Sequence, residues 1–149
     1  MEWFKIRESD AKREVFDPLR RRYVALTPEE EVRQICLHTL VTRYEVPPGL
    51  IAVEFSIKLH SLSKRADIVV FARTGSPLLI VECKAATVDI SENVLHQVLR
   101  YHAGLLSPYL LITNGRQQLC LFTGNAEGPP RFLDEIPLYH QMDMQACSP

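Results

Sequence analysis

The sequence predicts an α/β fold in which helices flank a mixed central β-sheet. Two short apolar runs, residues 68–71 and 78–81, are rich in β-branched side chains and are separated by turn residues, which is typical of a β-hairpin. Stretches at 27–44 and 91–106 have helical spacing, and a further apolar strand follows the second stretch. The expected order is helix, strand, strand, strand, helix, strand. With 149 residues, the chain is long enough for one domain with a single core.

The first 26 residues are highly charged and are expected to form an N-terminal arm. We expect a solvated arm that lays a few apolar side chains onto the domain, namely Trp3, Phe4, Val15, Phe16 and Leu19. The alternative is an arm that contacts a DNA backbone through three consecutive arginines, Arg20, Arg21 and Arg22.

The segment that begins at Thr27 carries strong signals for the start of a helix. Threonine is a favoured N-cap, Pro28 suits the first helical position, and Glu30 stands three residues after the cap, as in a capping box. Capping alone is enough to explain Glu30. The helix is expected to end near Tyr44, before a Pro-Pro-Gly sequence. Its core-facing residues are expected to be Val32, Ile35, Cys36, Thr39 and Leu40.

A half-buried strand is expected next, because residues 50–59 alternate between apolar and polar from Val53 onward. The apolar face of this strand would carry Val53, Phe55, Ile57 and Leu59. Residues 60–64 are expected to form a loop that leads into the central hairpin.

After the hairpin, residues 85–90 form a connector and Ser91 is the expected N-cap of the second helix. This helix would be the crossover that lets strand 108–113 run parallel to strand 78–81. Asn114-Gly115 is a favoured two-residue hairpin turn, which becomes a longer loop if the next two residues join it. The return strand 118–123 completes the central domain, 27–123. The tail 124–149, rich in proline and glycine, is expected to pack on the surface before fraying.

Charged residues flank the predicted hairpin at one end. Because side chains alternate along a strand, Glu82 and Lys84 share one face, Cys83 points to the core, and Asp67 lies beside them. Charges at the edge of an apolar sheet are costly unless they are paired or hold a metal. Two carboxylates suit Mg²⁺, which takes oxygen ligands, and the Cys83 backbone carbonyl is a further candidate ligand. The simpler alternative is a structural ion pair between Lys84 and Asp67 or Glu82.

Composition argues against several other function classes. A net charge of −1 gives no general attraction for nucleic acids. The four cysteines lack the short paired spacing of zinc or redox motifs, and Cys36, Cys83 and Cys120 are expected core thiols. No apolar run reaches the ~18 residues of a membrane span, and no signal-peptide pattern is present, so a cytoplasmic protein is expected. Metal-like spacing is absent among the histidines: His38, His60, His96, His102 and His140.

Asp67, then Glu82-Cys83-Lys84, then Gln97 and Tyr101 on the following helix resemble the PD-(D/E)xK nuclease superfamily, and the Gln-x-x-x-Tyr spacing is like that of its RecB-type branch. The chain more closely resembles the N-terminal domain of type I restriction enzyme R subunits, in a stand-alone form. The residues that carry this resemblance are 23–30, 65–71, 79–85 and 108–115, within a similar region from 16 to 140. The resemblance implies a restriction-endonuclease-like core and a nuclease-like domain at 27–123.

The same resemblance implies metal-dependent hydrolysis of DNA phosphodiester bonds. Asp67 and Glu82 would bind Mg²⁺ or Mn²⁺, and Lys84 would be the catalytic lysine. Gln97 and Tyr101 would be accessory residues near the metal or the DNA.

The acidic residue of the first helix would be Glu30, with Glu29 and Glu31 as rivals for that role. Ala66 departs from the family pattern, which has proline before the first aspartate.

The sequence has no Gly-x-x-x-x-Gly-Lys-Ser/Thr phosphate-binding loop and no room for a helicase motor. If the chain cleaves DNA, it would do so without ATP-driven translocation, or together with a restriction-modification or motor subunit that supplies the translocation. A homodimer would be natural for cutting both strands. The alternative function is a non-catalytic DNA-binding or assembly module that keeps the fold and its acidic site.

Overall fold

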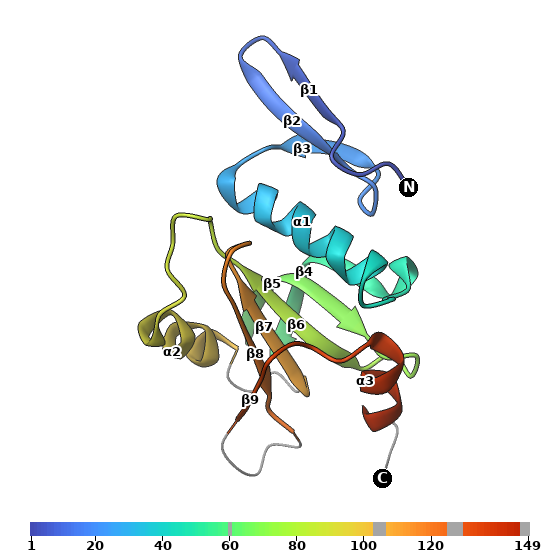
Figure 1. The fold of residues 1–149 in the computed structure, drawn as a ribbon, viewed down its shortest axis with the longest axis vertical. Coiled ribbons are helices and arrows are strands. Elements are labelled where there is room, and N and C mark those ends of the chain that lie inside the picture. Colours follow the sequence, from blue (N-terminus) through green and yellow to red (C-terminus); the bar gives the residue numbers. More distant parts are fainter. Residues whose placement is uncertain (60, 103–106, 125–129, 147–149) are drawn as a thin grey trace.

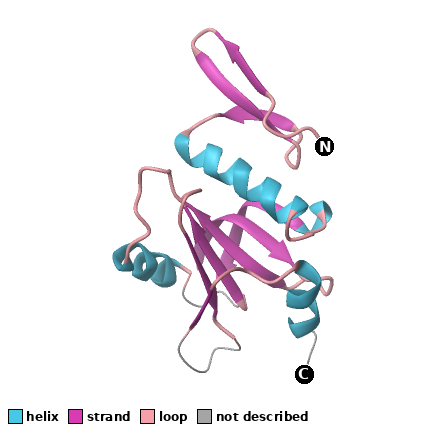
Figure 2. Cartoon of the chain, in the orientation of Figure 1, coloured by secondary structure: helices cyan, strands magenta, loops and turns pink. Residues whose placement is uncertain are grey.

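The computed structural model describes residues 1–59, 61–102, 107–124 and 130–146 and shows an α/β fold with two sheets and three α-helices (Figures 1 and 2). The helices are α1 (Pro28–Thr42), α2 (Glu92–Tyr101) and α3 (Tyr139–Ala146), with a short 3₁₀ turn η1 (Pro48–Leu50) after α1. The strands are β1 (Ile6–Ser9), β2 (Lys12–Asp17), β3 (Arg22–Ala25), β4 (Ile51–Leu59), β5 (Leu62–Phe71), β6 (Pro77–Cys83), β7 (Tyr109–Thr113), β8 (Gln118–Phe122) and β9 (Arg131–Leu133).

The central sheet is mixed and has the order β4-β5-β6-β7-β8-β9. The predicted hairpin is confirmed as β5 and β6, which pair antiparallel. Strands β6 and β7 pair in parallel, and α2 lies in the crossover between them. The predicted order of elements from α1 to β7 is therefore confirmed.

No strand was predicted from the sequence for the N-terminal arm, but the structure has strands there. Residues of β1, β2 and β3 form a separate antiparallel sheet, here called the meander, which lies beside α1 on the side away from the central sheet (Figure 1). Its charged residues pair across strands: Arg7 Nε donates to Glu14 Oε1 at 3.0 Å, and its guanidinium lies 3.8 Å from the Tyr23 ring centre. A two-residue turn with positive φ at Asp10 and Ala11 closes β1 onto β2.

The meander nevertheless contributes to the core, as the sequence predicts for its apolar side chains. Val15 is buried, and Trp3 and Leu19 pack against the cluster that joins α1 to the central sheet. Phe4 remains exposed and contacts the ring of His38 on α1. The region is therefore a docked layer of the fold.

Helix α1 begins as predicted, because the Thr27 hydroxyl accepts the backbone N–H of Glu30 at 3.1 Å. Its core stripe differs from the prediction at two positions, since Ile35 is exposed and Leu37 is fully buried. The reason is that α1 lies between the meander and the central sheet and is covered on two sides. The helix consequently also buries polar residues: Glu30, Arg33 and Gln34.

Three predicted boundaries change in the structure. Residues 62–64 belong to β5, so the expected loop is short, and His60 lies outside the described residues. Helix α2 begins after the predicted N-cap Ser91 and ends at Tyr101, while residues 103–106 are outside the described ranges. The Asn114-Gly115 turn is the longer of the two expected forms: the Asn114 side chain accepts the N–H groups of Arg116 and Gln117.

The C-terminal tail contributes more to the fold than expected. Strand β9 pairs with β8 and forms one edge of the central sheet. Helix α3 packs against β6 (Figure 1). The tail residues Ile136, Tyr139 and Met142 are buried in the main core cluster. The Tyr139 hydroxyl donates to the Phe71 backbone carbonyl at 3.0 Å. The tail is thus part of the core, and the predicted fraying could only concern residues 147–149, outside the described ranges.

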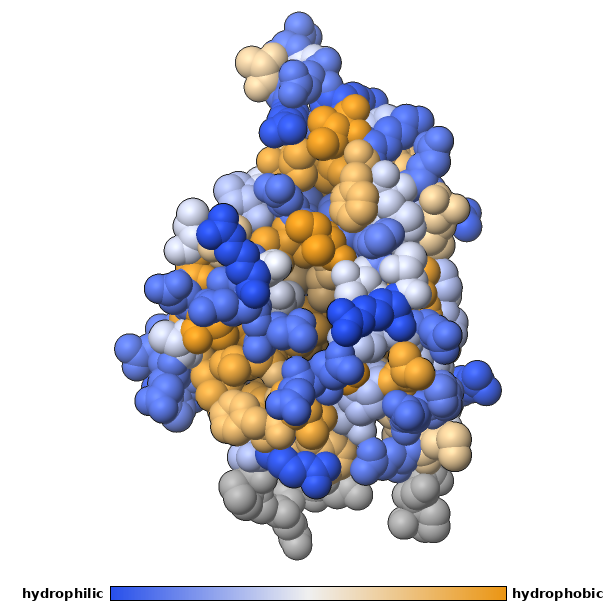
Figure 3. All heavy atoms as spheres, viewed as in Figure 1, coloured by the Kyte–Doolittle hydropathy of each residue, from blue (hydrophilic) through white to orange (hydrophobic). Residues whose placement is uncertain are grey.

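The surface in Figure 3 mixes charged groups with apolar patches, and the apolar groups on this face gather mainly over the lower part of the central sheet. No helix in the described part of the chain has both the length and the apolar character needed to cross a bilayer.

We expect Met142→Ala to destabilise the fold by about 2 kcal/mol, at the lower end of the cost of truncating a buried methionine, because α3 is peripheral and can partly relax. Met142 is fully buried, whereas Met144, two residues away, is 68% exposed. Urea unfolding followed by circular dichroism measures the change, and Met144→Ala is the matched control, expected within about 0.5 kcal/mol of wild type. Equal effects of the two substitutions would contradict the placement of α3.

Candidate functional site

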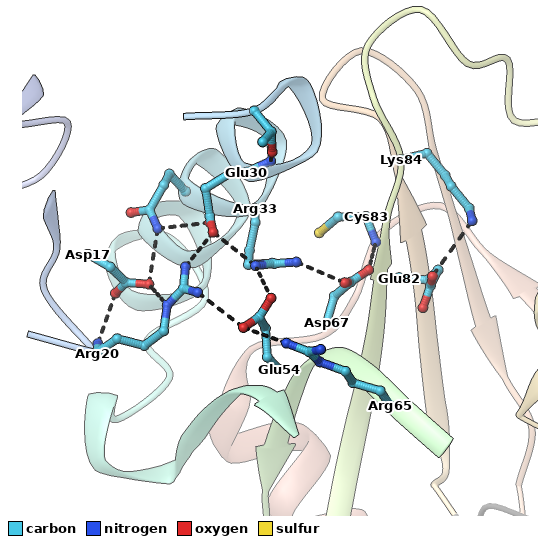
Figure 4. A network of polar contacts seen from close by, with 12 residues as sticks. Asp17, Arg20, Glu30, Arg33, Glu54, Arg65, Asp67, Glu82, Cys83 and Lys84 are labelled. Carbon is cyan, nitrogen blue, oxygen red and sulfur yellow. Dashed lines mark hydrogen bonds and ion pairs between the residues drawn. The ribbon is translucent and has the colours of Figure 1, made fainter. Parts of the chain in front are cut away.

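Asp67 lies on β5 and is held on both carboxylate oxygens. Arg33 of α1 donates from Nη2 to Asp67 Oδ1 at 3.1 Å, and the backbone N–H of Cys83 donates to Oδ2 at 2.7 Å (Figure 4). The carboxylate is therefore fixed between the helix above the sheet and the neighbouring strand β6. Cys83 itself points into the core and is buried, as predicted.

Glu82 and Lys84 lie side by side beyond Asp67, as predicted from strand alternation. Lys84 Nζ is 3.7 Å from Glu82 Oε1, and His102 Nε2 is 3.3 Å from Glu82 Oε2. The pair Lys84–Glu82 is partly exposed, so its contribution to stability is small, on the order of 0 to 1 kcal/mol. So small a stabilisation does not by itself explain why Glu82 and Lys84 occupy these positions.

A cleft of about 310 Å³ opens between β6 and α2. Among the residues that line the cleft are four of the predicted site residues: Glu82, Lys84, Gln97 and Tyr101. Arg65 of β5 and Val98 of α2 also line it. The Tyr101 hydroxyl accepts the backbone N–H of Arg65 at 2.9 Å, which ties α2 to the start of β5. Gln97 and Tyr101 thus reach the same place as Glu82 and Lys84, as the four-residue spacing on a helix predicts.

Glu30 does not contact Asp67 directly. Its Oε1 accepts from Arg33 Nη1 at 2.9 Å, and Arg33 in turn contacts Asp67. Among the three acidic candidates on α1, Glu30 is buried, whereas Glu29 and Glu31 are exposed. Only Glu30 is therefore connected to the site.

Glu54 is a further carboxylate at the site that was not predicted from the sequence. It lies on β4 between residues paired with Ile68 and Ala66, and its φ of 53° is in the left-handed region. Such a conformation costs on the order of 1 to 3 kcal/mol for a residue with a side chain and is commonly found at functional sites. The strain is offset by ion pairs of Glu54 with Arg33 at 3.1 Å and Arg65 at 2.7 Å.

The carboxylates at the site do not share positive charge equally. Burial raises the pKa of Glu54, but Arg33 and Arg65 outweigh burial, so this pKa lies below its ordinary value. For Asp67, burial and the nearby charge of Glu82 raise the pKa above its ordinary value, and the contacts from Cys83 and Arg33 offset only part of this rise. Positive charge is therefore short at Asp67, which lies near the negative charge of Glu82.

A divalent cation such as Mg²⁺ prefers carboxylate oxygens as ligands, and both Asp67 and Glu82 offer them. Such a cation would supply positive charge at Asp67 and relieve the repulsion between the two carboxylates. The described residues contain no group of three or more His, Cys, Asp or Glu side chains arranged to hold a metal ion. Asp67 and Glu82 would thus need further ligands from backbone, water or substrate, which is usual for Mg²⁺.

The structure brings together the predicted residues Asp67, Glu82, Lys84, Gln97 and Tyr101, and links Glu30 to them. Sequence reasoning missed four further residues near these groups, namely Arg20, Arg33, Glu54 and His102. The sequence signals for them are weak: Arg33 stands three residues after Glu30, and Glu54 interrupts an apolar strand. His102, which was assigned no chemistry, follows Tyr101 directly and is buried against Glu82.

Comparisons with known proteins agree with the resemblance to the N-terminal domain of type I restriction enzyme R subunits. Residues 28–137 match the family model described as the type I restriction enzyme R protein N terminus. Among solved structures, a fragment of a protein from Vibrio vulnificus YJ016, described as an HsdR subunit of a type I restriction enzyme, matches with a TM-score of 0.56 and 19% sequence identity. The similar region covers 80% of this chain and 25% of that chain. No curated protein matches significantly.

At 19% identity the structural likeness concerns the fold, and this chain spans a quarter of the length of that relative. The family model is broader evidence, because it covers α1, the whole central sheet and the connection to α3. The chain therefore belongs to the family of type I restriction enzyme R protein N-terminal domains.

Proposed function

We propose that this chain is a metal-dependent DNA endonuclease domain with a PD-(D/E)xK-type site on a restriction-endonuclease-like core. One observation carries the proposal: Asp67 and Glu82 lie close enough for the charge of Glu82 to raise the Asp67 pKa, and Glu82 lines a cleft with cationic residues. Two half-buried carboxylates, Asp67 and Glu82, beside Lys84 and Arg65 are suited to a divalent cation and a phosphodiester.

Asp67 and Glu82 would hold Mg²⁺ or Mn²⁺, with the Cys83 backbone carbonyl as a further candidate ligand. When bound, the metal would lower the pKa of a coordinated water and stabilise charge on the scissile phosphate. Lys84, 31% exposed at the mouth of the cleft, would orient the attacking water or neutralise the developing negative charge. Tyr101 fixes the backbone of Arg65, whose guanidinium lies at the cleft with Nη2 on Glu54. The other N–H groups of this guanidinium would contact a DNA phosphate.

DNA is the proposed substrate because the family model is that of a restriction enzyme subunit. The proposed partners are a restriction-modification or motor subunit, or a second copy of this chain for cutting both strands.

One observation favours a second function, a non-catalytic DNA-binding or assembly module. Both Asp67 oxygens already have donors within the protein, from Arg33 and from the Cys83 backbone. A carboxylate in this state is stable without a metal. The two functions differ in metal binding, which the next experiment measures.

We expect wild-type protein to bind Mn²⁺ at one or two sites in isothermal titration calorimetry, and Asp67→Ala to lose this binding. The physical reason is that Asp67 supplies one of the two carboxylates proposed to bind the metal, and burial and the charge of Glu82 leave it short of positive charge. Asp134→Ala is the matched control, because Asp134 is exposed on the loop after β9. Absence of Mn²⁺ binding by the wild type, even with DNA present, would refute the nuclease proposal and favour the binding module.

A further inference from the structure

Arg20 lies outside the part of the chain that matches the family model, which begins at residue 28. It lies in the tight turn between β2 and β3, where Asp17 accepts the backbone N–H groups of Leu19 and Arg20 at 2.8 and 3.0 Å. Instead of facing solvent with its neighbours, the Arg20 side chain is only 12% exposed and points toward α1 (Figure 4). Arg20 therefore brings a buried cation from the meander to a site on the family domain.

The guanidinium groups of Arg20 and Arg33 are joined twice, by two shared carboxylates. Glu30 Oε1 accepts from Arg20 Nη2 at 2.6 Å and from Arg33 Nη1 at 2.9 Å. Glu54 is 3.1 Å from Arg33 through Oε1 and 3.5 Å from Arg20 through Oε2. The four residues close a ring of alternating charge, here called the Arg–Glu ring, which joins the meander, α1 and β4.

Arg33 connects the Arg–Glu ring to Asp67. Arg33 uses Nη1 for both glutamates and Nη2 for Asp67 Oδ1, and its buried Nε has no hydrogen-bond partner among the residues that the structure describes. The direction of the Arg33 guanidinium therefore depends on the two glutamates. If Arg20 were absent, Glu30 and Glu54 would each lose a cation and would compete more strongly for Arg33, at the expense of Asp67.

We propose that Arg20 is a positioning residue of the candidate site: through Glu30 and Glu54 it fixes Arg33, and through Arg33 it orients the Asp67 carboxylate. This inference rests on the proposed function for its consequence in metal binding, while the orientation of Asp67 is testable without a metal. The meander is accordingly part of the working site in this chain, although the family model does not include it.

The triple arginine provides matched controls. Arg21 and Arg22 are exposed and make no ion pair with any residue that the structure describes, whereas Arg20 contacts Asp17, Glu30 and Glu54. The three side chains have the same chemistry, and only Arg20 belongs to the ring. Val15 provides a second kind of control, because it is buried in the meander and takes no part in the ring.

The experiment compares full-length wild type, Arg20→Ala, Arg20→Lys, Arg22→Ala and Val15→Ala under conditions where all are folded. The first readout is the Kd for Mn²⁺ from calorimetry. The second, taken without metal, is hydrogen exchange at the Cys83 amide by NMR, because this N–H donates to Asp67 Oδ2 at 2.7 Å. Arg20→Ala is expected to raise the Kd about tenfold, a typical cost of losing an outer contact to a ligand. It is also expected to speed Cys83 exchange about tenfold, since the hydrogen bond becomes looser.

Arg20→Lys should move both readouts in the same direction, because a single ammonium group cannot contact Asp17, Glu30 and Glu54 together as a guanidinium does. Arg22→Ala and Val15→Ala should leave both readouts at wild-type values. If Arg20→Ala matches Arg22→Ala, or if Val15→Ala reproduces the effect of Arg20→Ala, the positioning role is refuted. If wild type binds no Mn²⁺, the proposed metal-dependent function fails, and Cys83 exchange alone decides the role of Arg20.

Discussion

Lys84→Ala is expected to slow DNA cleavage by about three orders of magnitude while leaving the Kd for Mn²⁺ within about threefold of wild type, as for loss of a group that acts on the reacting atoms. Lys84 Nζ lies 3.7 Å from Glu82 Oε1 at the cleft, so it stands next to a proposed metal ligand without being able to bind a metal itself. Removal of its positive charge cannot weaken the attraction of Glu82 for a cation. The expected loss is therefore confined to kcat.

The measurement is cleavage of plasmid and linear DNA with Mg²⁺ or Mn²⁺, together with calorimetry on the same preparations. Lys58→Ala is the control, because Lys58 is an exposed lysine on β4. Lys84→Arg is expected to recover only part of the rate, since the larger planar guanidinium does not place its charge where the ammonium stood. Unchanged cleavage by Lys84→Ala would contradict a catalytic role for this residue and leave it as a partner of Glu82.

The central fold could be predicted from the sequence because local and tertiary signals agree there. Thr27 and Ser91 cap helices with their side chains, and the second half of β5, residues 68–71, forms with β6 and β7 a set of apolar runs that are largely buried on both faces. The meander could not be predicted in the same way. Strand β1 is exposed along its whole length, and β2 is buried only toward its end. Both strands are held by cross-strand charge pairs and turn geometry, so they show little hydrophobic periodicity.

Some residues of the candidate site could likewise be predicted from the sequence, and others could not. Asp67, Glu82 and Lys84 follow from strand alternation and hairpin pairing, which are local rules. Arg20 and Arg33 do not, because the contacts that tie them to the site, Arg20–Glu30 and Arg33–Asp67, join residues 10 and 34 positions apart. In addition, arginine on a helix or in a charged segment usually faces water. These two cations are shielded from water because the fold places the meander on one side of α1 and β5 on the other.

Burial of the Arg–Glu ring has a consequence for stability. Paired charges inside a protein gain little net stability when complete, but loss of one partner leaves the others desolvated and uncompensated. The largest stability effects outside the apolar core are therefore expected at the carboxylate that anchors the ring to the meander, Asp17. This side chain is fully buried and accepts from Arg20 Nε at 2.5 Å and from Gln34 Nε2 at 3.1 Å.

Asp17→Asn is expected to destabilise the fold by about 3 kcal/mol at pH 7, at the lower end of the cost of breaking a buried pair because Arg20 keeps its two glutamates. One oxygen of asparagine can still accept the backbone N–H groups of Leu19 and Arg20. Its NH₂ group, however, would face two donors, Arg20 Nε and Gln34 Nε2. Urea unfolding monitors the change, and Asp10→Asn is the control, since Asp10 is exposed in the meander turn with a positive φ that asparagine also tolerates.

The effect of Asp17→Asn should also depend on pH in a defined direction. Burial raises the pKa of the Asp17 carboxyl, but hydrogen bonds from the backbone and guanidinium of Arg20 outweigh burial, so the folded-state pKa lies below the ordinary 3.8. Folding then favours the ionised form, and its stabilising contribution is complete above 3.8 and is lost as the pH falls through the folded-state pKa. The difference between wild type and Asp17→Asn should therefore be constant from pH 7 to 5 and shrink toward pH 2. A difference that stays the same at pH 2 and pH 7 would show that the charge of Asp17 does not hold Arg20, and the Arg–Glu ring would then be fixed from α1 alone.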